Sequence, residues 1–373
     1  MFLQVTPKDP AVIVFTGGGT GGHVYPGIAV LQALQGAMPS GSCRFVWIGS
    51  ETGIEKGIVT GLGLEYHAIA TGKLRRYLDW KNLWDLFRVL AGCLQSRKLL
   101  KELRPAFLFS KGGFVSVPPV WAAKSLKIPV YSHESDLDPG LATRLNLRAS
   151  RIIFCAYPES VSYFPEAIRE RVMVTGNPVR RELLSGDPAW VRNTWNLPPG
   201  VKVVLVLGGS LGARQINQLV AEVLAKLPEN VFVVHQTGKE WEPLPDGTRY
   251  ISRPFFSTEM ANLYAGADVI FGRAGAGTLW EAAAAGVPLV LLPLGSGSRG
   301  DQGRNAALFA SRGAARVLGP DDGPEALLEA LRGFLDKADQ RLRAREALAA
   351  FDADEAAWRI AAPLLASLGG GHV

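Results

Sequence analysis

The feature that most constrains the fold of this chain is a unit that occurs twice: an apolar run, a glycine-rich turn and the start of a helical pattern. It first occurs where residues 11–15 lead into the turn 17–23 and a helical pattern over 24–34. It occurs again in the second half of the chain, where residues 201–207 lead into the turn 208–214 and a second helical pattern. A strand that enters a helix through such a turn is typical of a doubly wound α/β domain, whose ligands lie at the carboxyl ends of the strands. The repetition therefore predicts two such domains.

The first turn, Gly-Gly-Gly-Thr-Gly-Gly-His, has the composition of an anion-binding loop. Glycines let the backbone turn sharply and approach a ligand. The helix that follows supplies free backbone N–H groups and the positive end of its dipole. His23 is the one residue of the turn that can move a proton near neutral pH. The alternative is a tight strand-to-helix turn capped by Thr20, but the five glycines would cost such a turn much backbone entropy.

Short apolar, β-branched runs recur along the 373 residues, with helical patterns between most of them. This alternation predicts parallel sheets covered by helices on both faces. The runs are 11–16, 43–49, 106–109, 128–132, 151–155, 171–174, 201–207, 230–235, 267–271 and 287–292. Proline and glycine at 176–180 predict a boundary between a first domain, 1–176, and a second, 177–351. Residues 352–368 are predicted to form a last helix, which either caps the second domain or crosses back to the first.

The composition narrows the classes of partner. With 40 basic and 34 acidic residues the formal net charge is +6, which suits phosphates, nucleotides or acidic lipid. No long Lys/Arg block with interleaved aromatic residues occurs, so nucleic acid is not an expected partner. No HExxH, DxD or Cys/His cluster occurs, so no metal site is expected.

The cysteines and apolar runs bear on the compartment. Three cysteines lie in apolar runs without CxxC spacing, which predicts buried thiols in a reducing compartment. The first ten residues do not resemble a signal peptide, and no apolar run approaches about 18–20 residues. We therefore expect a cytoplasmic protein, and the composition leaves attachment to a membrane surface open.

A second glycine turn is expected in the first domain, after the strand at 106–109. Lys111, Gly112 and Gly113 form another backbone nest, to which Lys111 adds a charge. Two such loops at one sheet edge would hold a diphosphate between them. A purely structural turn explains this loop, taken alone, equally well.

Acid and base side chains follow the next strand, 128–132. His133, Glu134 and Asp136 come at its carboxyl end, where α/β enzymes place their sites. Asp136 is the better candidate to reach a ligand. Glu134 either takes part in catalysis or, as a buried residue, braces His23 or a loop.

The second domain has a comparable constellation after the strand at 267–271. The segment 273–281 has small residues that allow close backbone approach, and Thr278 offers a hydroxyl and an N–H at a helix start. Glu281 is suited to bridging two ribose hydroxyls. Thr278 and Glu281 also have the spacing of a capping box, which would not explain the small residues. Further on, Gln302 either bonds to sugar hydroxyls or belongs to a solvated helix start.

Residues 72–104 differ in character from the rest of the chain, because basic residues surround aromatic ones at helical spacing. Such a segment suits the headgroup region of an anionic bilayer. The residues expected to meet it are Arg75, Arg76, Tyr77, Trp80, Trp84 and Phe87. The alternative is a core-facing helix, which we expect to hold for Leu83, Phe87 and Leu90.

Taken together, these motifs resemble the MurG family of bacterial peptidoglycan glycosyltransferases, which has the GT-B fold. The matching segments are GGGTGGHVYPGIAV, SKGGFVSVP, HESDLDPGL, TGNPVR, GGSLGARQIN, RAGAGTLWEAAAAGVP and DQGRNA, in this order from residue 17 to residue 306. The resemblance implies two Rossmann-like domains whose parallel sheets face each other across a cleft, with the last helix crossing back to the first domain.

The activity that the resemblance implies is transfer of N-acetylglucosamine from UDP-N-acetylglucosamine to undecaprenyl-diphosphate-N-acetylmuramoyl-pentapeptide (lipid I), which forms lipid II. The implied place is the cytoplasmic face of the cell membrane, against an anionic lipid surface and with other cell-wall synthesis proteins as partners. Four other classes stay open from the residues alone: another UDP-sugar transferase, a UDP-N-acetylglucosamine epimerase, a dinucleotide-binding dehydrogenase, and a non-catalytic paralogue that binds a UDP-sugar.

The resemblance also implies roles for individual residues. The residues implied for UDP-N-acetylglucosamine are Thr20, Gly21, Gly22, Asp136, Arg180, Ser210, Phe256, Ala276, Gly277, Thr278, Leu279, Glu281 and Gln302. The residues implied for the acceptor diphosphate are Gly18, Gly19, His23, Lys111, Gly112 and Gly113. Phe256 matches a position whose backbone contacts uracil. The chain departs from the common pattern at Asp136, where many members have asparagine, and before Gln302, where two adjacent glutamines are usual.

The expected reaction is an inverting transfer without a metal or cofactor. A base takes the proton of the acceptor C4 hydroxyl, whose oxygen attacks the anomeric carbon and expels UDP. Backbone N–H groups, helix dipoles and Arg180 meet the charge of the leaving group. We expect His23 to be the base, because an unshifted imidazole accepts a proton near neutral pH. Asp136 is the second candidate, and Glu134 would orient one of the two.

Overall fold

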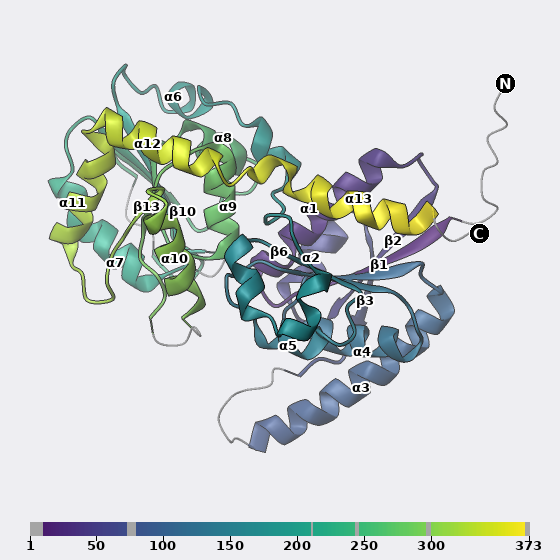
Figure 1. The fold of residues 1–373 in the computed structure, drawn as a ribbon. Coiled ribbons are helices and arrows are strands. Elements are labelled where there is room, and N and C mark those ends of the chain that lie inside the picture. The colour runs from purple at the N-terminus through teal and green to yellow at the C-terminus, as the bar shows by residue number, and fades with distance from the viewer. Residues whose placement is uncertain (1–9, 73–79, 210–211, 243–245, 296–299, 370–373) are drawn as a thin grey trace, which may run out of the picture. The chain divides into compact units, whose positions relative to one another are not determined.

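The computed structural model describes residues 10–72, 80–209, 212–242, 246–295 and 300–369, with the backbone alone for 80–84. The chain divides into two compact units. The first comprises Met1–Pro178 and Glu355–Val373, and the second comprises Val179–Asp354. Figure 1 shows that each unit has a sheet with helices packed on its faces.

The sheet of the first unit has seven strands in the order β3-β2-β1-β4-β5-β6-β7, all parallel. The strands are β1 (Ala11–Thr16), β2 (Cys43–Ser50), β3 (Glu65–Ile69), β4 (Phe107–Ser110), β5 (Val130–Glu134), β6 (Ile152–Cys155) and β7 (Val172–Val174). β1 lies between β2 and β4, and Thr16 is opposite Ser110. The turns after β1 and β4 therefore leave the sheet side by side, at the point where the winding reverses and doubly wound folds bind ligands.

Helices cover both faces of this sheet. They are α1 (Tyr25–Ala37), α2 (Ile54–Gly61), α3 (Trp80–Leu103), α4 (Val117–Ser125), α5 (Leu141–Asn146) and α13 (Ala356–Gly369). On one face, Phe15 of β1 is buried in a cluster with Leu31 of α1 and Ile360 of α13. On the other face, Val14 is buried with Leu100 of α3 and Val120 of α4. The last helix thus packs on the first unit beside α1 (Figure 1).

Helix α3 presents apolar side chains to solvent. Phe87 and Leu90, for which the core-facing alternative was expected, are 57% and 51% exposed, and Leu94 is 71% exposed; the exposure of Phe87 is what its expected contact with the membrane requires. The expectation was wrong because the helix packs through a different face, where a Cβ on Gly92 would lie 2.1 Å from the carbonyl oxygen of Ala70. Arg75, Arg76 and Tyr77 lie outside the described residues, as do the side chains of Trp80, Leu83 and Trp84.

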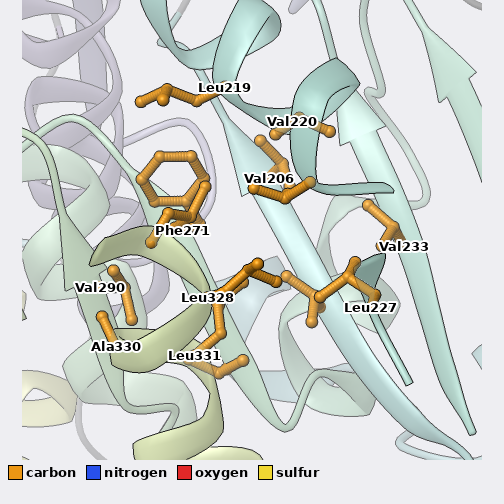
Figure 2. Packing of buried hydrophobic residues seen from close by; sticks show 14 of the residues in the cluster. Val206, Leu219, Val220, Leu227, Val233, Phe271, Val290, Leu328, Ala330 and Leu331 are labelled. Atoms are coloured by element: carbon orange, nitrogen blue, oxygen red, sulfur yellow. The ribbon is translucent and has the colours of Figure 1, made fainter. Parts of the chain in front are cut away.

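The sheet of the second unit has six parallel strands in the order β10-β9-β8-β11-β12-β13. The strands are β8 (Lys202–Leu207), β9 (Val231–Gln236), β10 (Tyr250–Arg253), β11 (Val269–Gly272), β12 (Leu289–Leu291) and β13 (Ala315–Val317). The helices used below are α6 (Trp190–Thr194), α7 (Arg214–Val223), α8 (Met260–Gly266), α9 (Ala276–Ala285), α10 (Asp301–Ser311), α11 (Pro324–Leu335) and α12 (Ala338–Ala349). In Figure 2, Val206, Phe271 and Val290 of the central strands pack with Leu328 and Leu331 of α11.

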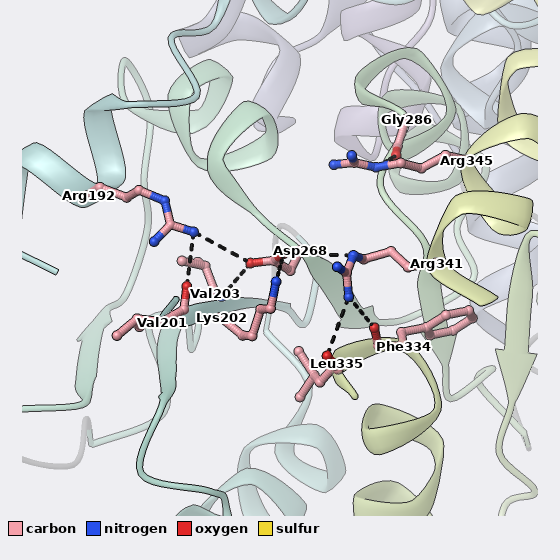
Figure 3. Close-up of polar contacts among 10 residues, drawn as sticks. All are labelled: Arg192, Val201, Lys202, Val203, Asp268, Gly286, Phe334, Leu335, Arg341 and Arg345. Atoms are coloured by element: carbon pink, nitrogen blue, oxygen red, sulfur yellow. Dashed lines mark hydrogen bonds and ion pairs between the residues drawn. The ribbon is translucent and has the colours of Figure 1, made fainter. Parts of the chain in front are cut away.

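Asp268, immediately before β11, connects several elements at the amino edge of this sheet (Figure 3). Its carboxylate accepts hydrogen bonds from the N–H of Val203 at 3.0 Å and from Lys202 Nζ at 3.3 Å. Arg192 of α6 and Arg341 of α12 each approach it to 3.9 Å. Doubly wound folds bind ligands at the opposite edge of the sheet, where the carboxyl ends of the strands lie, and we call this the ligand edge.

A buried histidine links strands and helix in the second unit. His235 of β9 is 1% exposed; its Nε2 is 3.1 Å from Asn217 Oδ1 of α7, and its Nδ1 is 2.9 Å from the hydroxyl of Tyr250. A neutral imidazole satisfies both contacts by donating to the asparagine and accepting from the tyrosine. Burial lowers the pKa of His235 to about 4. The unfolded chain, where the pKa is near 6.5, therefore binds more protons between these two pH values.

We expect His235→Gln to weaken the loss of stability that the protein suffers in acid. Stability from the neutral histidine is complete above about pH 6.5 and is lost as the pH falls toward 4, at up to about 1.4 kcal/mol per pH unit. Urea denaturation of wild type and variant at pH 7, 6 and 5 gives the slope of the free energy of unfolding against pH for each. The other titrating groups are the same in both proteins, so the difference between the two slopes reports on His235. Equal slopes would show that His235 is not held neutral in the folded protein.

Candidate functional site

The first glycine turn connects β1 to α1 through a single 3₁₀ turn at Gly21–His23. Gly19 has a φ of +87°, and a Cβ on Gly17 would lie 2.8 Å from the carbonyl oxygen of His23. The N–H of His23 makes the first bond of the turn, to Thr20 O at 3.1 Å. The N–H groups of Thr20, Gly21 and Gly22 precede it, as expected at a helix start that receives an anion.

The second glycine turn, after β4, packs directly on the first. Gly112 and Gly113 have φ values of +89° and +75°. A Cβ on Gly113 would lie 2.4 Å from the carbonyl oxygen of Gly18 and 3.3 Å from Cγ of His23. The two turns that the sequence predicts at one sheet edge are therefore in contact, with the imidazole of His23 against the second.

His23 does not have the unshifted pKa that we expected. Its half-buried ring has Nδ1 2.9 Å from Thr20 Oγ1. Burial, and secondarily the charge of Lys111, lower the pKa of His23 to about 3. The imidazole is therefore neutral at physiological pH, but it is a weaker base than expected.

Lys111 lies beneath the turns and is only 2% exposed. Its Nζ donates to Ser135 Oγ at 2.5 Å, and that hydroxyl donates to Asn177 Oδ1 at 2.6 Å. Burial lowers the pKa of Lys111 to about 8, and the charges of Glu134 and Asp136 oppose this. From this buried position Lys111 supplies its charge as a positive field from inside the protein.

Glu134 braces a loop. Its Oε1 accepts the N–H of Asp136 at 3.0 Å, and its Oε2 accepts the N–H of Gly140 at 3.0 Å and the hydroxyl of Thr143 at 2.6 Å. Both oxygens of Glu134 are thus engaged in holding this loop, which is the bracing arrangement that was one of its two expected roles. The loop that it holds carries Asp136, whose side chain is half-buried.

At the ligand edge of the second sheet, α9 begins directly after the turn that follows β11. The helix starts at Ala276 with Gly275 as its N-cap, and no side chain caps it, so the capping box at Thr278 does not form. The first helical bond runs from Leu279 N–H to Gly275 O, which leaves the N–H groups of Ala276, Gly277 and Thr278 at the helix start. The side chain of Leu279 is fully buried, so its expected contact with the nucleotide stays a prediction that would involve the backbone.

Glu281 lies one turn into α9 and is held by two partners. Tyr264 of α8 donates its hydroxyl to Glu281 Oε2 at 2.8 Å, and Arg180 Nη2 is 3.6 Å from Oε1. Burial raises the pKa of Glu281, while Arg180 and Tyr264 oppose this shift. Its side chain stays 19% exposed, so Glu281 is not sealed off from solvent.

Two other predicted residues, Phe256 and Gln302, lie at the same edge of the sheet. The N–H of Phe256 is bonded to Gln236 Oε1 at 3.0 Å, so a ligand would have to use another backbone group there. Gln302, in the first turn of α10, accepts the N–H of Leu294 at 2.9 Å and so ties the loop after β12 to the helix. Ser210 lies outside the described residues.

Sequence reasoning missed Glu55 and Tyr264, which hold the two predicted ligand elements in place. Glu55 binds the N–H of Gly19 in the first unit, and Tyr264 binds Glu281 in the second. Glu55 was detectable in principle, because it follows β2, the neighbour of β1, at the same edge of the sheet. Tyr264 had no such signal, since its helix pattern resembles any core-facing one.

No group of three or more His, Cys, Asp or Glu in the described ranges is arranged to hold a metal ion. None of the helices in the described part of the chain is long and apolar enough to cross a membrane.

Comparison with known proteins adds an independent finding. The glycosyltransferase family 28 N-terminal domain matches residues 13–154, and the family 28 C-terminal domain matches residues 203–360. A UDP-N-acetylglucosamine–N-acetylmuramyl-(pentapeptide) pyrophosphoryl-undecaprenol N-acetylglucosamine transferase of Treponema denticola is 44% identical over 343 residues, covering 86% of this chain and 87% of the relative. The protein of the same name from Lachnospira eligens is 43% identical, covering 86% of this chain and 90% of the relative.

Solved structures are similar as well. The crystal structure of Acinetobacter baumannii MurG matches with a TM-score of 0.68 at 26% identity, covering 94% of this chain and 98% of that one. The UDP-GlcNAc 2-epimerase of Neisseria meningitidis bound to UDP-GlcNAc matches with a TM-score of 0.67 at 14% identity, covering 95% and 99%. The second likeness shows the fold alone.

Proposed function

Because the chain belongs to glycosyltransferase family 28 and, within it, to the UDP-N-acetylglucosamine–N-acetylmuramyl-(pentapeptide) pyrophosphoryl-undecaprenol N-acetylglucosamine transferases, we propose that it transfers N-acetylglucosamine from UDP-N-acetylglucosamine to lipid I, forming lipid II. The observation that carries the proposal is 44% identity over most of the chain to a relative of that name. The two ligand edges support it, since a transferase needs separate places for a donor nucleotide and an acceptor diphosphate.

The donor is assigned to the second unit. Glu281 receives the ribose hydroxyls through its carboxylate, and Arg180, 3.6 Å from Oε1, moves to the diphosphate, where its fork of donors fits. The N–H groups at the start of α9 supply further donors. Phe256 contacts the uracil through its backbone, and Gln302 contacts the sugar, with Asp136 and the first glycine turn also assigned to the donor sugar.

The acceptor diphosphate is assigned to the paired glycine turns of the first unit. The N–H groups of Thr20, Gly21 and Gly22 stand at the helix start, and the second turn lies against the first, where Gly18 and Gly113 are in contact. The buried ammonium of Lys111 adds a positive field without needing to touch the ligand. His23, between the turns, is then next to the sugar that the diphosphate carries.

The reaction is a single displacement with inversion. The oxygen of the acceptor C4 hydroxyl forms a bond to the anomeric carbon as the bond from that carbon to the β-phosphate oxygen breaks, and UDP leaves. The hydroxyl proton passes to His23, whose neutral ring can accept it, and the bound diphosphate raises the basicity of that ring by its negative charge. Arg180 and the start of α9 stabilise the charge that develops on UDP.

We expect His23→Ala to lower kcat by about 10²–10³-fold and Asp136→Asn to lower it by about tenfold or less, because only the first removes the base. Since the pKa of His23 is about 3, kcat/KM should show no acid limb near pH 6.5 in profiles from pH 6 to 8. Initial rates at saturating substrates measure kcat of the variants, and initial rates at substrate concentrations well below KM give the pH profile of kcat/KM. Near wild-type turnover of His23→Ala, with loss in Asp136→Asn, would assign the base to Asp136.

The experiment that tests the activity class offers a panel of UDP-sugars to the purified chain with a short-chain lipid I analogue, with and without EDTA. We expect transfer from UDP-N-acetylglucosamine alone and no effect of EDTA. Transfer from a different UDP-sugar, or to a different acceptor, would indicate another UDP-sugar transferase. Binding of the UDP-sugar without transfer would indicate a non-catalytic relative, and loss of transfer with EDTA would contradict the metal-free mechanism.

We assign attachment to an anionic lipid surface, at the cytoplasmic face of the membrane, to the outer side of α3. Phe87, Leu90 and Leu94 recur there at helical spacing and are more than half exposed. Trp121 of α4, which packs beside α3, is 40% exposed. The first domain would thereby meet the membrane in which its acceptor lies.

The double replacement Leu90→Gln and Leu94→Gln is expected to reduce sedimentation with phosphatidylglycerol vesicles by about tenfold or more, because apolar burial of each leucine is worth about 1.5–3 kcal/mol. Transfer to a detergent-soluble acceptor should be unchanged. Leu342→Gln, on α12 and 58% exposed, is the matched control and should leave sedimentation unchanged. Equal sedimentation of the double variant and wild type would place the contact elsewhere.

A further inference from the structure

Glu55, in the first turn of α2, is a fully buried carboxylate that the proposed reaction does not use. Its Oε2 accepts the N–H of Gly19 at 3.0 Å. Its Oε1 accepts both the N–H of Ser50 at 3.0 Å and the hydroxyl of Ser50 at 2.5 Å. The side chain thus joins the end of β2 to the first glycine turn, and both of its oxygens act as acceptors.

The backbone around this carboxylate fits it closely. A Cβ on Gly18 would lie 2.4 Å from the Cδ of Glu55, and one on Gly53 would lie 2.2 Å from its Oε2. Ser50 is itself held, because Tyr66 donates its hydroxyl to Ser50 O at 2.5 Å. The glycines at these positions make room for the carboxylate, in addition to making the turn.

Five of the seven residues in this turn are glycine, the residue with the most backbone freedom, and binding an anion would lose that entropy unless the turn were held beforehand. Glu55 fixes the direction of one N–H, that of Gly19, toward the protein interior. The following N–H groups, of Thr20, Gly21 and Gly22, are then left at the helix start. The carboxylate therefore selects which donors face a ligand.

We propose that Glu55 is the positioning residue of the acceptor-diphosphate loop, holding the first glycine turn in its anion-binding form through the N–H of Gly19. The assignment of the diphosphate to this loop rests on the proposed function. The role requires two acceptor oxygens, because donors reach the carboxylate from both sides. An amide of the same shape has one acceptor and one donor, so its NH₂ group would confront either Ser50 or Gly19.

The first test is Glu55→Gln with Glu51→Gln as its matched control, since Glu51 lies four positions earlier and is exposed. We expect Glu55→Gln to raise the KM for a short-chain lipid I analogue by about tenfold or more, and to leave the affinity for UDP, measured by calorimetry, within about twofold, because the nucleotide is assigned to the second unit. Ser50→Ala, which keeps two of the three bonds, should have a smaller effect in the same direction. If Glu55 had only a general structural role, Glu55→Gln would weaken the binding of UDP as well as of the lipid I analogue, and it would lower the melting temperature.

The second measurement is hydrogen–deuterium exchange of the full-length protein, followed in a peptide that contains Gly19. Exchange should be faster in Glu55→Gln than in wild type and Glu51→Gln, with little change in peptides of the second unit. Unaltered exchange, or an unaltered KM for the lipid I analogue, would overturn the proposal. If wild type failed to transfer sugar, the proposed function would fall while the exchange result still decided whether Glu55 holds the turn.

Discussion

Replacing Glu281 by glutamine is expected to lower kcat/KM for UDP-N-acetylglucosamine by about 10²–10³-fold, mainly through KM, because hydrogen bonds to a charged group contribute about 1.5–3 kcal/mol each. The variant loses the charged acceptor for the ribose and also the charge that orients Arg180, 3.6 Å away. The KM for the acceptor should change little. Steady-state rates with either substrate varied provide the measurement.

The variant Tyr264→Phe tests whether Tyr264 positions Glu281, and it leaves the carboxylate that contacts the donor in place. It removes the 2.8 Å bond to Glu281 Oε2 and should raise the KM for the donor by about three- to tenfold, with kcat nearly unchanged. Tyr250→Phe is the matched control, because it removes a buried hydroxyl whose partner is His235. A donor KM that stays at the wild-type value in both Glu281→Gln and Tyr264→Phe would remove the nucleotide from this edge.

Gly113→Ala is expected to abolish productive acceptor binding, lowering kcat/KM for a lipid I analogue by about 10²-fold or more, since the position has a φ of +75° and tolerates no side chain without rearrangement. The new methyl group would lie 2.4 Å from Gly18 O, so the two turns must separate. Affinity for UDP, measured by calorimetry, should be retained.

The control for this variant is Gly36→Ala in α1, where the added methyl group meets no atom within 4 Å. That change should leave activity unaltered and stabilise the helix by about 0.5–1 kcal/mol. Normal acceptor kinetics in Gly113→Ala would mean that the contact between the glycine turns is not needed for acceptor binding.

Much of the fold was predictable, because the central strands are continuous apolar runs with helices between them. Strands β3, β10 and β13 were not predicted. Each lies at an edge of its sheet and is only partly buried, as in Glu65–Ile69 and Ala315–Val317, so its sequence lacks the apolar run of a central strand. The last helix could not be placed by its period, since an apolar stripe does not specify the surface on which it packs.

The position of the site was also predictable, whereas the state of its side chains was not. Topology alone places the turns after β1 and β4 together, because adjacent parallel strands end at one edge. The inward direction of Lys111, the low pKa of His23 and the bracing by Glu134 depend on three-dimensional contacts with Ser135, Thr143 and the loops. Exposure of Phe87 depends likewise on which face of α3 packs.

The most direct test is whether the purified chain transfers labelled N-acetylglucosamine from UDP-N-acetylglucosamine to a short-chain lipid I analogue, with release of one UDP for each sugar transferred. We predict acceptor-dependent formation of a lipid II analogue, and its loss in Gly113→Ala and Glu281→Gln. No labelled lipid product from wild type at saturating donor and acceptor, in a preparation that binds UDP, would contradict the account.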